Sequence, residues 1–162
     1  MKLVFVESDF LNSDVEELFL PLFSDIRKIS DKNEIFHLIE NDHFIPNMVI
    51  LDFEDHHSES IDYAKNLKEI SSKLGAHIHI YSIIDDLDQL NYTELSEYID
   101  DFIILPFSNN YFINRIQIAI KNLKSIKMNI EYTNHLTEAS RISDRLIDKL
   151  LEAIKQISVS LS

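Results

Sequence analysis

Short apolar runs alternate with longer amphipathic segments over most of the chain. The apolar runs are about five residues long and rich in β-branched side chains, which is typical of buried β-strands. We predict strands at residues 2–6, 26–30, 48–51, 77–82 and 102–105. The run at 26–30 is the most polar of them, which favours a position at the edge of a sheet.

Between these runs, apolar residues recur at spacings of three and four, the pattern of a helix with one buried face. The segments with this pattern are residues 12–23, 35–39, 59–74, 87–98 and the stretch after Ser108. Gly75 suits the end of a helix, and Ser108 suits the cap of the next helix start. Alternating strands and helices predict an α/β fold, a doubly wound five-stranded parallel sheet with helices on both faces.

The pattern changes beyond about residue 124, where helical periodicity continues without proline or glycine to the last residue. The apolar positions at seven-residue spacing are Leu136, Ile147, Leu150, Ile154, Ile157 and Leu161. Such spacing is typical of a coiled-coil seam. We therefore divide the chain into a domain at 1–124 and a C-terminal helical extension at 125–162. The extension either folds back on the domain, forms a parallel coiled-coil dimer, or links to a further module.

Acidic residues follow two of the predicted strands. Asp52 ends the run at 48–51, and Glu7-Ser8-Asp9 follows the run at 2–6. In open α/β folds the chemistry lies at the carboxyl ends of the strands, so these carboxylates are expected at one edge of the sheet. Paired carboxylates there indicate a site that handles a divalent cation or a phosphoryl group.

Composition narrows the classes of function. The 162-residue chain carries a net charge of −13, which opposes binding to nucleic acid or to an anionic membrane. Gly75 is the only glycine, so glycine-rich dinucleotide and P-loop motifs are excluded, and a metabolic enzyme is not expected. There is no cysteine, and the first apolar stretch is too short for a signal peptide or membrane span. These features fit a cytoplasmic protein.

The order of elements and the residues at strand ends resemble the receiver domain of two-component response regulators, a CheY-like fold. The resemblance covers residues 1–124 and implies a flavodoxin-like sheet of strand order 2-1-3-4-5. It also implies that Asp52 is the phosphoacceptor. Glu7, Asp52 and the backbone carbonyl of Glu54 would hold Mg²⁺.

Further positions match the receiver pattern. The resemblance implies that Ser82, at the end of the fourth predicted strand, contacts the phosphoryl group. Phe102 would occupy the aromatic switch position, and Pro106-Phe107 match the segment that follows the receiver lysine. The implied partner is a histidine kinase or another signalling protein, with a homodimer formed through the C-terminal helix.

Three positions depart from that pattern. Ser8 replaces the second acid of the metal-binding pair, and Leu105 stands where receivers carry a lysine. Ile83 follows Ser82 where a small residue is usual, which narrows access to Asp52. The alternative is therefore a pseudo-receiver, a dimerisation or docking module that works without phosphorylation. The alternating His77 and His79 are expected to be surface or helix-facing residues rather than metal ligands.

Overall fold

The computed structural model describes residues 1–11, 13–52, 57–85 and 92–161. The chain divides into two units, Met1–Ala119 and Ile120–Ser162. The first unit holds every strand, and the second consists of the larger part of one long helix. No helix in the described ranges is both long and apolar enough to span a membrane.

The first unit is built on a parallel sheet of strand order β2-β1-β3-β4-β5, as the sequence predicts. The strands are β1 (Lys2–Val6), β2 (Asp25–Ile29), β3 (Met48–Asp52), β4 (His79–Ile84) and β5 (Asp101–Ile104). The middle strand β3 is buried along its first four residues and ends on the partly buried Asp52. A buried central strand of this kind requires cover on both faces of the sheet.

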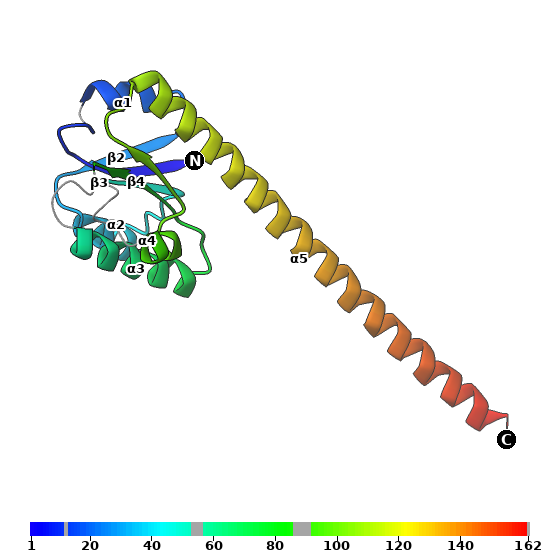
Figure 1. Ribbon diagram of the computed structural model, residues 1–162. Coiled ribbons are helices and arrows are strands. Elements are labelled where there is room, and N and C mark those ends of the chain that lie inside the picture. The colour runs from blue at the N-terminus through cyan, green and yellow to red at the C-terminus, as the bar shows by residue number, and fades with distance from the viewer. Residues whose placement is uncertain (12, 53–56, 86–91, 162) are drawn as a thin grey trace. The chain divides into compact units, whose positions relative to one another are not determined.

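Helices supply that cover. They are α1 (Ser13–Phe19), α2 (Glu34–Glu40), α3 (His57–Lys73), α4 (Tyr92–Tyr98) and α5 (Asn109–Ser160). In the first unit, α1 and the beginning of α5 lie on one face of the sheet, and α2, α3 and α4 lie on the other (Figure 1). The predicted doubly wound fold with a long C-terminal helix is therefore confirmed.

Alternate residues along each strand enter two separate cores. On the α1 side, the rings of Phe5 and Tyr81 contact Phe19 and Phe112, with ring centroids 5.8 and 5.9 Å apart. Phe19 and Phe112 also contact each other at 5.9 Å. On the α2 and α3 side, the cluster is mainly aliphatic and includes Val4, Val49, Leu51, Ile80 and Leu67.

The fourth strand begins two residues later than predicted, at His79 instead of residue 77. The end of α3 explains the shift. Gly75 adopts a φ of 60°, and the Ala76 N–H donates to the Ser71 carbonyl at 3.0 Å, so the chain is still leaving the helix there. The strand also continues past the predicted end to Ile84, so Ser82 is an interior residue of β4 rather than its last one.

The second unit is helical as far as residue 160. Its apolar side chains are at least 39% exposed in the single chain, from Ile126 to Leu161. The coiled-coil positions Ile147, Leu150, Ile154 and Ile157 are 52–63% exposed. Exposed apolar surface of this extent is typical of helices that pack against another surface.

Candidate functional site

Asp52 lies at the carboxyl end of the central strand. It is the last residue of β3 and pairs in register with Ile83 of β4. Both of its carboxylate oxygens are buried. Its position in the alternation is that of Met48 and Ile50, so its side chain belongs to the face covered by α1 and the start of α5.

Glu7 follows β1, the strand beside β3. Continuing the observed pairing of Phe5 with Ile50 by two residues brings Glu7 level with Asp52 on the same face. The Glu7 N–H still belongs to the sheet, because it donates to the Ile29 carbonyl at 2.8 Å. The exposed Glu7 carboxylate accepts from Lys28 Nζ at 3.3 Å. The fold therefore brings the two predicted metal-binding carboxylates to neighbouring strand ends.

Ser8 stabilises the turn that follows Glu7. Its hydroxyl oxygen accepts hydrogen bonds from the N–H groups of Phe10 at 3.3 Å and Leu11 at 3.1 Å. Such local bonds are typical of serine in turns. Asp9, the next acid, is exposed. The turn thus places a neutral hydroxyl where a second metal-binding carboxylate would be needed.

Ser82 and Phe102 lie side by side on the other face of the sheet. They pair in register across β4 and β5, and Ser82 also pairs with Leu51. Ser82 is fully buried, and its hydroxyl has no hydrogen-bond partner among the described residues. Phe102 is partly buried against the aliphatic core. Ser82 and Asp52 face opposite sides of the sheet. The Ser82 hydroxyl could therefore reach a phosphoryl group on Asp52 only around the carboxyl ends of the strands.

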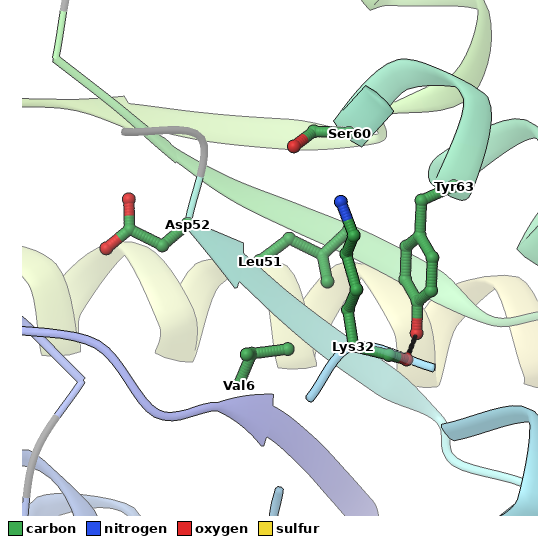
Figure 2. Close-up of a pocket in the computed structure, with 6 residues that line it drawn as sticks. All are labelled: Val6, Lys32, Leu51, Asp52, Ser60 and Tyr63. Carbon is green, nitrogen blue, oxygen red and sulfur yellow. Dashed lines mark hydrogen bonds between the residues drawn. The ribbon is translucent and has the colours of Figure 1, made fainter. Parts of the chain in front are cut away.

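A small pocket with a volume of about 40 Å³ opens beside Asp52 on the α3 side. The residues that line it are Val6, Lys32, Leu51, Asp52, Ser60 and Tyr63. Figure 2 shows the Asp52 carboxylate turned away from the Lys32 side chain, whose ammonium group extends between Asp52 and Tyr63. The volume suits an ion or one or two water molecules rather than an organic cofactor.

Tyr63 fixes the pocket's far wall. Its hydroxyl donates to the Lys32 carbonyl, and its ring lies 5.1 Å from that of Phe36. Burial raises the pKa of Tyr63, so this hydroxyl keeps its proton and acts as a donor. Lys32 and Tyr63 were not singled out as site residues from the sequence, because an isolated lysine after a strand and a helical tyrosine carry no spacing signal.

The end of β5 lacks the positive charge that receivers place there. The partly buried Leu105 donates its N–H to the Ile84 carbonyl at 2.8 Å and is joined to Pro106 by a cis peptide bond. The Phe107 ring lies 6.4 Å from Phe10 and 5.1 Å from Phe112. The segment is therefore held by apolar and backbone contacts, and Leu105 supplies no group that could bind an anion.

Some predicted positions lie outside the described residues. Glu54, expected to offer its carbonyl to Mg²⁺, is among them. The described donor set near Asp52 consists of hard oxygen ligands, the carboxylates of Glu7 and Asp52. Mg²⁺ accepts one or two carboxylates and completes its octahedron with water or phosphate oxygens, so these residues fit it.

No family model and no curated protein matches this sequence. Solved structures do match in fold. The signal receiver domain of a protein described as a LuxO repressor from Vibrio parahaemolyticus has 16% identity and a TM-score of 0.59, covering 78% of this chain and 95% of that one. A CheY-like receiver domain from Methylobacillus flagellatus has 13% identity and a TM-score of 0.58, covering 74% and 96%.

A third match comes from the streptococci and is described as a redox sensor evolved from two-component response regulators. It has 14% identity and a TM-score of 0.60, and the alignment covers 79% of this chain and 54% of that chain. The strand order, the placement of the helices and these matches agree. The first unit has the fold of response-regulator receiver domains.

Proposed function

We propose that this chain is a signal-transduction receiver in which Asp52 accepts a phosphoryl group. The observation that carries the proposal is the position of Asp52 at the end of the central strand β3, level with Glu7 at the end of β1. The donor would be the phosphohistidine of a partner kinase or a small acyl phosphate. A carboxylate oxygen attacks phosphorus, the bond to the donor breaks, and an acyl phosphate forms on Asp52.

The residues around Asp52 have distinct roles in this proposal. Glu7 and Asp52, with the carbonyl of Glu54, would hold Mg²⁺, which neutralises charge on the transferring group. Because Leu105 carries no charge, the acyl phosphate lacks the ion pair that receivers make at that position. We expect it to be formed slowly and to be coupled weakly to the rest of the domain.

The signal would leave the site through the neighbouring Ser82 and Phe102. A phosphoryl group on Asp52, at the carboxyl ends of the strands, would offer a hydrogen-bond acceptor to the Ser82 hydroxyl. That hydroxyl has no hydrogen-bond partner among the described residues. Movement of Ser82 toward that edge would alter the packing of Phe102, its partner in register on β5. This links phosphorylation to the surface formed by α4 and β5.

Phosphorylation is tested by intact-mass spectrometry after incubation with acetyl phosphate and Mg²⁺. The proposal expects a gain of one phosphoryl group that disappears in Asp52→Asn. A matched control is Asp42→Asn, since Asp42 is an exposed acid in the loop after α2. Labelling that persists in Asp52→Asn, or no labelling at saturating donor, would contradict the proposal.

The second candidate is a pseudo-receiver that signals by docking or dimerisation alone. It is favoured by Leu105, by the buried Asp52 oxygens and by the exposed seam of the second unit. The streptococcal match is itself described as a redox sensor that evolved from response regulators. In that protein, a fold of this kind has a sensing function. In this candidate the seam residues Ile147, Leu150, Ile154 and Ile157 pair with those of a second copy.

The seam is tested by analytical ultracentrifugation of the full chain. Ile154→Asn places a polar group at the centre of the seam and should shift a dimer toward monomer. Gln156→Asn, two residues away on the same exposed helix, should leave the association state unchanged. If the two variants have the same association state, the seam is not the dimer interface.

A further inference from the structure

A second polar cluster lies at the amino-terminal end of the sheet, at the opposite ends of the strands from Asp52. His77 precedes β4, His79 is the first residue of β4, and Asp100 precedes β5. One ring nitrogen from each histidine and one carboxylate oxygen of Asp100 all lie within 4.8 Å of one another. Residues two apart in an extended chain point to the same side, which explains why both histidines reach Asp100.

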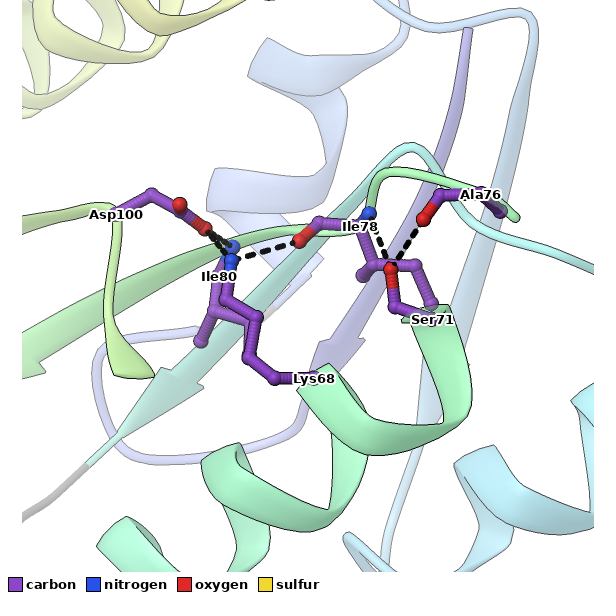
Figure 3. A network of polar contacts seen from close by, with 6 residues as sticks. All are labelled: Lys68, Ser71, Ala76, Ile78, Ile80 and Asp100. Carbon is purple, nitrogen blue, oxygen red and sulfur yellow. Dashed lines mark hydrogen bonds and ion pairs between the residues drawn. The ribbon is translucent and has the colours of Figure 1, made fainter. Parts of the chain in front are cut away.

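The backbone around His77 is fixed from both sides. The Ser71 hydroxyl donates to the Ala76 carbonyl at 2.5 Å and accepts from the Ile78 N–H at 3.2 Å (Figure 3). The residues before and after His77 are therefore both tied to the last turn of α3. A side chain mounted on such a segment loses little freedom when it binds a ligand.

The Asp100 carboxylate is held in a similar way. Its Oδ2 atom accepts from the Ile80 N–H at 2.7 Å and from Lys68 Nζ at 2.5 Å, and Lys68 also donates to the Ile78 carbonyl at 3.3 Å (Figure 3). Within the described ranges, the hydrogen bonds that the Asp100 carboxylate accepts use Oδ2 alone. The other carboxylate oxygen, Oδ1, remains available to an additional ligand.

His79 carries a polar atom that the described residues leave without a hydrogen-bond partner. Its side chain is 7% exposed, and its Nε2 atom is buried without a hydrogen-bond partner among the described residues. Buried polar atoms are normally satisfied, so an orphaned imidazole nitrogen requires an explanation. The exposed His77 provides a side open to solvent.

We propose that His77, His79 and Asp100 form a binding site for a divalent transition-metal ion of the zinc type. Two imidazoles and a carboxylate are a zinc donor set, with a fourth position left for water. Zinc bonds of about 2.1 Å place tetrahedral ligand atoms about 3.4 Å apart, which side-chain rotations can reach from the observed separations. A bound ion would join the start of β4 to the start of β5.

The site is tested by isothermal titration of the metal-free full chain with zinc chloride. We expect one ion per chain, and His77→Ala and Asp100→Asn should each weaken binding by about tenfold or more. His135→Ala, in the exposed helix of the second unit, is the matched control and should bind as the unmodified chain does. Asp52→Asn should also bind normally, since that residue lies at the other end of the sheet.

Two further measurements separate metal binding from a loss of folding. Zinc should raise the melting temperature of the unmodified chain and not that of His77→Ala, whose side chain is exposed and whose fold should be intact. Lys68→Gln removes a positive charge beside Asp100 and should tighten zinc binding. Unchanged affinity in His77→Ala, or absence of binding by the unmodified chain, would overturn the proposal.

Discussion

Two buried serines at opposite ends of the same sheet differ in how well they are satisfied. Ser71, at the amino-terminal end, both donates and accepts a hydrogen bond through its hydroxyl. Ser82, toward the carboxyl end, is fully buried and has no hydrogen-bond partner among the described residues. Two lysines differ in the same way. Lys68 makes a 2.5 Å ion pair with Asp100, whereas Lys28 makes 3.3 and 3.9 Å pairs with Glu7 and Glu16, whose side chains are more exposed than that of Asp100.

The difference lies in how the polar groups around the two serines are held. At the amino-terminal end, hydrogen bonds from α3 and Asp100 hold the backbone of β4 and its approach, although His79 Nε2 has no partner among the described residues. Toward the carboxyl end, the Ser82 hydroxyl lacks such a partner and could bind a ligand. Buried polar groups without hydrogen-bond partners are tolerated at functional sites, where interactions elsewhere in the fold offset their cost in stability. Matched substitutions at the two ends can measure how much each end contributes to the free energy of unfolding.

The largest effect is expected for Ser71→Ala. The substitution leaves the Ile78 N–H and the Ala76 carbonyl without their side-chain partner, and the Ile78 group is buried. Loss of a buried partner costs about 1–3 kcal/mol, so we expect a decrease of about 2 kcal/mol in the free energy of unfolding. Urea denaturation measures it. A change below about 0.5 kcal/mol, the size of an ordinary surface substitution, would show that this network is not stabilising.

Lys68→Gln should have the next largest effect. Lys68 and Asp100 are each 25% exposed in their side chains, and the ammonium group also binds the Ile78 carbonyl. We expect a loss of about 1 kcal/mol, the upper range for a partly screened pair. The measurement is thermal or urea unfolding at low and high salt with a chelator present. Because the pair is electrostatic, the loss should shrink as salt increases.

Much of this fold could be predicted from the sequence because apolar periodicity and buried strand runs are local signals. The place of Asp52 at a strand end follows from them, whereas the strand order was implied by the resemblance to receiver domains. The shift of β4 to residues 79–84 could not be predicted, since it depends on how Ser71 and Gly75 end α3 in three dimensions. Helix-end geometry of that kind is set by tertiary hydrogen bonds rather than by spacing.

The candidate site was predictable only in part, for a related reason. Glu7 and Asp52 could be placed together because parallel strands end at one edge. Lys32 and Tyr63 reach the pocket beside Asp52 from a loop and a helix that no sequence spacing connects. The approach of Asp100 to His77 and His79 likewise depends on local contacts at the starts of β4 and β5, and the sequence alone led us to expect histidines without a ligand role.

Ser82→Ala should act in the opposite direction from Ser71→Ala. Removing a fully buried hydroxyl that has no partner among the described residues relieves an unfavourable burial, so we expect unchanged stability or a gain of up to about 1 kcal/mol. The same urea experiment gives both values. If Ser82→Ala instead lowers the free energy of unfolding as much as Ser71→Ala does, the Ser82 hydroxyl has a hydrogen-bond partner in solution. The contrast between the two serines would then fail. A gain in stability with a shorter-lived acyl phosphate would indicate a functional hydroxyl.

The smallest effect is expected for Lys28→Gln, the counterpart of Lys68→Gln at the carboxyl end. Its ion pairs with Glu7 and Glu16 join side chains that are 31–48% exposed, so water screens them and stability should change by less than about 0.5 kcal/mol. Its effect on the site should be larger than its effect on the fold. Without the Lys28 ammonium group beside it, the Glu7 carboxylate should attract a cation near Asp52 more strongly, and Mg²⁺ should support labelling by acetyl phosphate at lower concentration. Lys68→Gln, at the far end of the strands, should leave that Mg²⁺ requirement unchanged, and equal shifts in the two variants would mean that overall charge rather than Glu7 controls the site.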